Sequence, residues 1–185
     1  MSDPVSALGN AAYEGFATIR DVGPVGMISL RCKHDVAGLA KAVKTAVGVA
    51  MPGTRQIVRD GVWAAGWMSP DEVLLVLPYD QVSRTLAGLA KSLAGAHHLA
   101  VDVSDARAVF RVEGPKAAQV LMKLSPVDVA GMQPGELRRT RTAQVAAAFW
   151  AADGGYTVVC FRSVAGYVMG LLRHAAMPGA ELHPS

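Results

Sequence analysis

The same spacing of apolar residues occurs twice in this sequence, about 80 residues apart. Four segments have the three- and four-residue spacing of a helix with one apolar face: Val36, Leu39, Ala40 and Val43; Val82, Leu86, Leu89 and Leu93; Ala117, Val120, Leu121 and Leu124; and Val164, Val168, Leu171 and Ala175. The first and third correspond at a displacement of 81, and the second and fourth at 82. A repeat of this length predicts two supersecondary units of the same construction.

Apolar runs typical of strands repeat together with the helices. VGMISLRC leads into the first helix as RAVFRVEG leads into the third. Each second helix follows an apolar hairpin, whose turns are Ser-Pro-Asp at 69–71 and Asp-Gly-Gly at 153–155. We therefore expect an α+β fold made of two βαββα (ferredoxin-like) halves.

The repeat also sets the expected domain boundaries. Residues 17–98 form the first half and residues 99–177 the second. Residues 1–16 are expected to be a flexible N-terminal arm, and residues 178–185 a C-terminal tail rich in turn-forming residues.

The helix starts carry side chains that favour the first turn. Asp35, Asp80 and Ser163 are expected to accept hydrogen bonds from free amides as N-caps. Pro115 is expected at the first helical position of the third helix, where its missing N–H is not needed.

The composition is that of a globular chain with an apolar bias. Of its 185 residues, 51% are hydrophobic and 18% charged, and the mean hydropathy is +0.28. A partner that covers part of an apolar surface is one explanation. A general preference for alanine is the other.

The charge pattern narrows the classes of partner. The net charge is +3, but lysines and arginines are scattered and rarely alternate with aromatic residues, which argues against nucleic-acid binding. The densest basic cluster is Arg138, Arg139 and Arg141, which indicates either a solvated face or a contact with an acidic partner on an edge or entry strand.

Three features of the sequence bear on the cellular location of the protein. Residues 1–16 do not resemble a signal peptide, and no run reaches the ~18 apolar residues of a membrane helix. Cys32 and Cys160 lie in apolar runs and are expected to be buried free thiols. We expect a cytoplasmic protein without membrane contact.

Residue patterns that carry chemistry are sparse. His97 and His98 lack a nearby acid or cysteine, so a polar loop is favoured over a metal site. The Gly23–Gly26 stretch is too short to cradle a phosphate, and the GxGxxG, GxSxG and HExxH patterns do not occur. We expect no catalytic, cofactor-binding or metal-binding residues in this chain.

Several stretches of the second half resemble one family. They are Asp102-Val103-Ser104, Phe110 to Pro115, Ala117-Ala118 with Val120-Leu121, Ser125 to Asp128, Arg139 to Thr142, and Phe161-Arg162-Ser163. The chain is thereby identified as similar to the gamma-subunit family of heterotetrameric sarcosine oxidase, which resembles the folate-binding domain of glycine-cleavage T-protein. The resemblance extends from about Ala17 to Ala175 and implies a T-protein-like fold.

The sequence departs from the wider T-protein pattern where that pattern carries folate chemistry. The wider family has an acidic pair entering the strand expected here at Ala143, whereas residues 142–146 contain no carboxylate. Gln144 can hydrogen-bond a ligand but cannot act as an acid or base near neutral pH. The longer C-terminal portion of T-protein and a KGCYxGQE-like stretch are also missing.

The resemblance implies a role in a complex. Sarcosine oxidase of this type oxidatively demethylates sarcosine to glycine with tetrahydrofolate and O2, giving methylenetetrahydrofolate and H2O2. FAD, FMN and NAD are implied on the alpha and beta subunits and zinc on the delta subunit. This chain is expected to be a non-catalytic assembly subunit that docks mainly on alpha, with Arg138, Arg139 and Arg141 as candidate residues at the rim of the interface.

Two other classes remain open. A stand-alone folate-binding protein or enzyme of the T-protein-like family is disfavoured by the missing carboxylate at 142–146. An accessory protein of nucleic-acid modification would need a basic stripe with exposed aromatic residues, which the sequence does not suggest.

Overall fold

The structure is a computed structural model, and it describes residues 4–182. The chain divides into two units: one contains Val25–Ser104, and the other contains Met1–Pro24 together with Asp105–Ser185. We refer to the first as the continuous unit and the second as the split unit. Among the described residues, no helix has both the length and the apolarity to cross a membrane.

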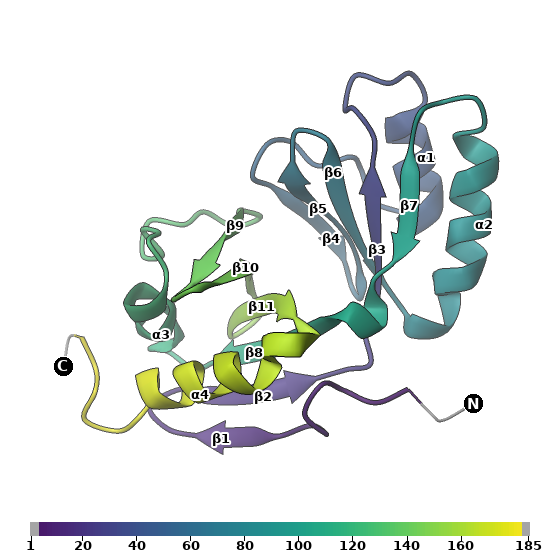
Figure 1. Cartoon of the computed structure of the whole chain (residues 1–185). Helices are drawn as coiled ribbons and strands as arrows, with labels where there is room; N and C mark the ends of the chain where they lie inside the picture. Colours follow the sequence, from purple (N-terminus) through teal and green to yellow (C-terminus); the bar gives the residue numbers. More distant parts are fainter. Residues whose placement is uncertain (1–3, 183–185) are drawn as a thin grey trace. The chain divides into compact units, whose positions relative to one another are not determined.

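The continuous unit is a five-stranded antiparallel sheet covered by two helices. Its elements, in chain order, are β3 (Gly26–Arg31), α1 (Leu39–Val47), β4 (Ile57–Asp60), β5 (Trp63–Ser69), β6 (Glu72–Leu77), α2 (Val82–Ser92) and β7 (Leu99–Asp102). The strand order is β4-β5-β6-β3-β7. Figure 1 shows α1 and α2 side by side on one face of this sheet.

The core of the continuous unit follows from period-two strands facing apolar helices. Ile28 and Leu30 of β3 and Leu75 of β6 point to the same face and are completely buried. Leu39 and Leu89, from the two helices, belong to the same cluster. The helical spacing read from the sequence is thus the spacing that fills this core.

The split unit repeats the plan with six strands. Its elements are β1 (Ala12–Glu14), β2 (Thr18–Val22), β8 (Arg107–Glu113), α3 (Ala117–Leu124), β9 (Leu137–Thr142), β10 (Val145–Ala152), β11 (Gly155–Phe161) and α4 (Ala165–Ala175). The order is β1-β2-β8-β11-β10-β9, with every neighbouring pair antiparallel.

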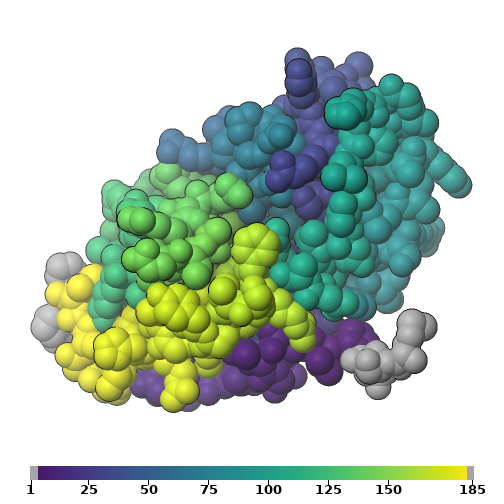
Figure 2. All heavy atoms as spheres, in the orientation of Figure 1, coloured from purple at the N-terminus to yellow at the C-terminus, as the bar shows by residue number. Residues whose placement is uncertain are grey.

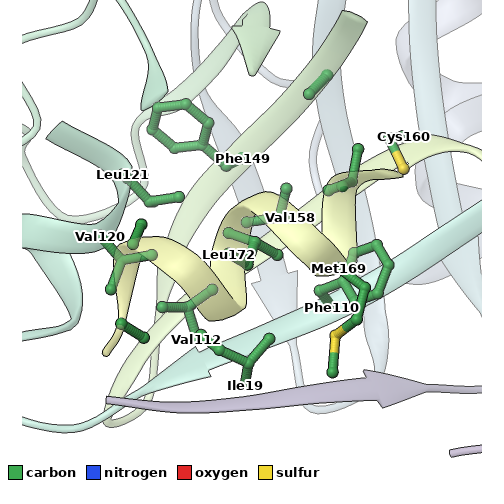
Figure 3. Close-up of a cluster of buried hydrophobic side chains, with 14 of the residues drawn as sticks. Ile19, Phe110, Val112, Val120, Leu121, Phe149, Val158, Cys160, Met169 and Leu172 are labelled. Atoms are coloured by element: carbon green, nitrogen blue, oxygen red, sulfur yellow. The ribbon is translucent and has the colours of Figure 1, made fainter. Parts of the chain in front are cut away.

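The core of the split unit lies between α3, α4 and one sheet face. Figure 3 shows Phe110 and Val112 of β8 beneath α4, which contributes Met169 and Leu172. Ile19 of β2 joins the same cluster and is completely buried. Burying side chains of this size contributes about 1.5–3 kcal/mol each, so the cluster is the main stabilising element of the unit.

The α+β class with two related halves is confirmed, but the chain divides differently from the expected contiguous halves. The strand β2 precedes β3 in the sequence yet pairs with β8 in the split unit. Likewise β7 precedes β8 yet pairs with β3 in the continuous unit. Each half therefore gives its leading strand to the sheet of the other, and the boundaries near 17 and 98–99 move to 24–25 and 104–105.

Besides the exchanged strands, and β1 in the split unit, each unit contains one further strand beyond the three of the βαββα pattern. These strands are β4 and β9, which lie at corresponding sheet edges. Their sequences, IVRD and LRRTRT, are rich in charge and lack the apolar alternation that indicates a half-buried strand. At a sheet edge, charged side chains are common because they oppose unwanted pairing.

The expected helix caps are wrong. Asp80 and Ser163 lie in short 3-10 turns that precede α2 and α4. The helix after Asp35 begins only at Leu39, with Gly38 in the left-handed region. Pro115 precedes the first residue of α3 by two positions, and none of the four helices has a side-chain N-cap hydrogen bond within the described chain.

The described part of the expected flexible arm is ordered by Asp21, a buried residue of β2. One carboxylate oxygen of Asp21 accepts hydrogen bonds from the amides of Leu8 (2.7 Å) and Asn10 (3.2 Å). A little further along, β1 pairs with β2. Residues 1–3 lie outside the described range.

The described part of the C-terminal tail is attached to α3. The Leu182 amide donates to the Gln119 side-chain oxygen at 2.7 Å, and the Lys123 ammonium donates to the Ala180 carbonyl. Gln119 and Lys123 are four residues apart and therefore lie on one helix face. In Figure 2 the segment from α4 to the tail, in yellow, is a visible part of the surface of the split unit.

Candidate partner interface

The three arginines proposed at the interface lie on β9, an edge strand, as the sequence suggested. Period-two alternation nevertheless separates them. Arg138 is paired with Phe149 and shares the face that bears the helices, whereas Arg139 is paired with Ala148 on the opposite face together with Arg141. The three arginines therefore do not form a single patch.

Arg138 is engaged within its own unit. Its guanidinium lies 2.5 Å from the Glu136 carboxylate, and the two side chains are 23% and 16% exposed. Its Nε is buried without a hydrogen-bond partner among the described residues. A side chain held in this way is a poor candidate for an initial contact with a partner.

Arg139 and Arg141 are exposed, and neither has an ion pair within the described part of the chain. Their cross-strand neighbours on β10 are the small residues Ala148 and Ala146. The two guanidinium groups are thus neither neutralised nor shielded by bulky neighbours. They remain candidates for an interface.

The hairpin between β9 and β10 turns at Ala143 and Gln144. Ala143 has a φ of +50°, which an alanine rarely adopts. Its amide donates to the Leu124 carbonyl at the end of α3 at 2.7 Å, so the turn is fixed to that helix. Gln144 is exposed at the tip, so the position that lacks a carboxylate is in a turn rather than in the expected strand.

The histidines are in a loop, as the sequence suggested. His97 is exposed, and His98 Nδ1 lies 2.9 Å from the Ala96 carbonyl. No group of three or more His, Cys, Asp or Glu side chains that could hold a metal ion occurs within residues 4–182. Neither histidine therefore belongs to such a group.

The two cysteines are buried and free, as expected. Burial raises the pKa of the Cys160 thiol to about 11, the Arg107 charge opposes this, and Asp21 adds to it. Burial also raises the pKa of Cys32, and the charge of Asp35 acts in the same direction. Thiols with raised pKa values are poor nucleophiles because little thiolate is present near pH 7.

Some exposed apolar side chains were not identified from the sequence. Leu99 and Val101 of the edge strand β7 are 56% and 42% exposed. Phe161 is 48% exposed, and the Arg107 guanidinium lies 4.1 Å from the centre of its ring. The alternation of side chains along β7 predicts that Leu99 and Val101 lie on the same face. The pairing of β7 with β3 was needed to show that the helices cover the opposite face.

Comparison with known proteins identifies a family. The family model described as the sarcosine oxidase gamma subunit family matches residues 32–177. The gamma subunit from Corynebacterium sp. (strain U-96) is 32% identical over 133 residues, which are 71% of this chain and 63% of that protein. The one from Corynebacterium sp. (strain P-1) is 28% identical over 66% of this chain and 60% of its own length. The chain thus spans less than two thirds of the length of these curated relatives.

Solved structures agree with this assignment. A chain of heterotetrameric sarcosine oxidase from Corynebacterium sp. U-96, in complex with pyrrole 2-carboxylate, superposes with a TM-score of 0.79 and 26% identity, covering 90% of this chain and 87% of that one. Glycine cleavage aminomethyltransferase T from Bartonella henselae gives 0.62 at 14% identity, covering 82% of this chain and 44% of that one, which supports the shared fold. This chain belongs to the sarcosine oxidase gamma subunit family.

Proposed function

We propose that this chain is the gamma subunit of a heterotetrameric sarcosine oxidase and acts in it as a non-catalytic assembly subunit. The observation that carries the proposal is the family match over residues 32–177. The superposition with a chain of a heterotetrameric enzyme over 90% of this chain supports it. The proposed complex oxidises sarcosine to glycine with tetrahydrofolate and O2.

A non-catalytic role is supported by the chemistry of the described side chains. The turn at Ala143 and Gln144 carries an amide where the T-protein pattern places acid. The two thiols are buried with raised pKa values, which lowers their nucleophilicity. These residues do not match a general acid, a general base or an activated nucleophile.

The proposed partners are the alpha, beta and delta subunits, with alpha as the main contact. The chain has no dinucleotide-binding glycine pattern, and its described residues form no cluster of metal ligands. We therefore assign FAD, FMN, NAD and zinc to the other subunits. Two buried free cysteines favour the cytoplasm as the location of the complex.

Co-expression with and without the other subunits tests the proposal. The tagged chain should recover alpha, beta and delta in equal amounts, and the purified complex should produce H2O2 when sarcosine is added. The chain alone should show no flavin absorbance and no turnover, and it should be less soluble than in the complex because its composition is apolar.

The alternative function gives a different result. A stand-alone folate-binding protein would remain soluble without partners and would bind tetrahydrofolate in calorimetry. A purified single chain that oxidises sarcosine, or one that recovers none of the three subunits, would contradict the proposed function.

A further inference from the structure

The outer edge of β9 has main-chain groups available for a further strand. The turn at Ala143 and Gln144 has two residues, with a positive φ at the first and not at the second, as in a type II′ hairpin. In such a hairpin, the residues that flank the turn form a hydrogen-bonded pair. Pairing then alternates, so Thr140 faces β10 with its N–H and C=O, while Arg139 and Arg141 direct theirs to the open edge.

The open edge is accessible at the two arginines. Both side chains are exposed, and no backbone hydrogen bond from Arg139 or Arg141 to an element other than a strand occurs in the described chain. In Figure 2 the green region that includes β9 and β10 reaches the molecular surface. Unpaired donors and acceptors in this position are a template for strand addition.

The positive charges of Arg139 and Arg141 determine which kind of strand can pair with the open edge of β9. In a symmetric antiparallel pair of two β9 strands, centred on Thr140, Arg139 would face Arg141 of the other copy. Like charges directly opposite each other are destabilising, so a second copy of this chain is disfavoured. Carboxylates at alternate positions of an added strand would instead face both guanidinium groups, which bind carboxylates in a bidentate geometry.

We propose that β9 binds an extended acidic segment of another sarcosine oxidase subunit as an additional strand, with main-chain hydrogen bonds at Arg139 and Arg141 and carboxylates opposite their side chains. This inference rests on the proposed function, because it requires the assembled complex. It excludes Arg138, which is held by Glu136 on the other face of the strand.

Hydrogen exchange in the assembled complex tests the main-chain part. Exchange should be read at single residues by electron-transfer fragmentation. The amides of Arg139 and Arg141 should exchange as slowly as those of Arg138 and Thr140, which face β10. The Arg59 amide is an internal reference, because β4 is also an edge strand and its two-residue turn at Gly61 and Val62 directs that amide outward. Fast exchange at both Arg139 and Arg141 would overturn strand addition.

A proline tests the edge without disturbing the hairpin. Arg139→Pro removes an outward N–H and leaves the pairing with β10 in place, which edge strands tolerate. Arg139→Thr removes the same charge but keeps the N–H. Assembly should be weaker for the proline variant than for the threonine variant at equal folded content by circular dichroism. Equal assembly of the two variants would contradict the main-chain contact.

Charge reversal at Arg139 and Arg141 tests whether the added strand is acidic. This test remains valid even if the proline variant does not fold. Arg139→Glu combined with Arg141→Glu should slow assembly about tenfold or more at low salt, with a smaller effect at high salt. Arg59→Glu combined with Arg84→Glu changes the net charge equally at exposed sites elsewhere and should leave the rate unchanged.

The outcomes separate the two proposals. If the wild-type chain assembles and the charge-reversed variant does so at the same rate, the acidic strand is wrong and the subunit function stands. If the wild-type chain does not assemble with the other subunits, both proposals are wrong.

Discussion

The ammonium group of Lys123 on α3 donates a hydrogen bond to the carbonyl of Ala175, the last residue of α4, at 2.6 Å. It also donates to the Ala180 carbonyl and lies 4.9 Å from the centre of the Phe16 ring. One side chain thus joins the end of α4, the C-terminal segment and the chain before β2. The positive charge also lies at the negative end of the α4 dipole.

Replacing Lys123 with methionine should destabilise the split unit. Lys123→Met keeps the aliphatic stem but leaves the Ala175 and Ala180 carbonyls without their charged donor, and we expect a loss of about 1–3 kcal/mol in the free energy of unfolding. Urea denaturation measures this. Lys91→Met, on an exposed position of α2, is the control and should change stability by less than about 0.5 kcal/mol. Equal effects of the two substitutions would show that the Lys123 contacts do not contribute.

Glycines in this chain should respond in opposite ways to alanine. A Cβ at Gly15 would collide with the Ala176 carbonyl oxygen, and one at Gly155 with that of Val112. We expect Gly15→Ala and Gly155→Ala to destabilise the protein by about 1–3 kcal/mol, since main-chain atoms cannot move aside.

The matched controls for these two glycines are on α4. A Cβ at Gly166 or Gly170 would contact nothing within 4 Å. Gly166→Ala and Gly170→Ala should each stabilise the protein by about 0.5–1 kcal/mol, because alanine is the better helix former. Thermal denaturation of all four variants distinguishes a steric clash of the added Cβ from a change in helix propensity. A loss of stability in both α4 variants would contradict the open space around Gly166 and Gly170.

The turn at Ala143 should be improved by glycine. Alanine at a φ of +50° is unfavourable, whereas glycine adopts this conformation readily. Ala143→Gly should stabilise the protein by a few tenths to about 1 kcal/mol. The gain is limited because glycine has more conformational entropy than alanine in the unfolded chain, which offsets part of the relieved strain. Ala146→Gly, in the exposed part of β10, should instead destabilise it by about 0.5–1 kcal/mol. Differential scanning calorimetry measures both shifts, and a lower Tm for Ala143→Gly would refute the argument.

Stability should fall at alkaline pH because of Cys160. The thiol ionises at its ordinary pKa of 9.0 when the chain is unfolded and at about 11 when it is folded. The contribution of this thiol to stability is therefore complete below pH 9 and decreases as the pH rises toward 11, by at most about 1.4 kcal/mol per pH unit.

Denaturation of Cys160→Ala across this pH range isolates the effect. The variant should be less stable at pH 8 because of the lost packing, but its stability should decline less steeply than that of the wild type between pH 9 and 11. Cys32→Ala is the control that retains the Cys160 thiol. Parallel pH curves for Cys160→Ala and the wild type would show that the thiol does not titrate as described.

The sequence allowed the helices and hairpins to be predicted because the apolar residues of each element fill the core of its own unit. The spacing of Val120 and Leu121 in α3, for example, is that of residues which are completely buried. The exchange of β2 and β7 could not be predicted, because the choice between the equivalent positions beside β3 and beside β8 depends on tertiary pairing. The expected N-caps at Asp80 and Ser163 were wrong because both residues lie within 3-10 turns that lead directly into α2 and α4.

The candidate interface was predicted only in part. The arginine cluster correctly indicated an edge strand, but β9 was not recognised as a full strand of six residues. Its charges conceal the period of two that would have separated Arg138 from Arg139 and Arg141. The exposure of Leu99 and Val101 depends on which face of β7 the helices cover, and that is decided by the pairing of β7 with β3.

The strand exchange has a consequence for synthesis on the ribosome. The continuous unit, Val25–Ser104, can fold as soon as it leaves the exit tunnel, whereas β2 emerges before it and must wait for β8. At ~5–20 residues per second, the intervening segment of roughly 80 residues takes about 4–16 s to make, and during this time β2 can pair only with β1. A holdase that binds nascent chains would have its greatest effect in this interval. The sheet that contains β9 is completed last, because it needs β11, so the proposed docking edge forms only after β11 has been made.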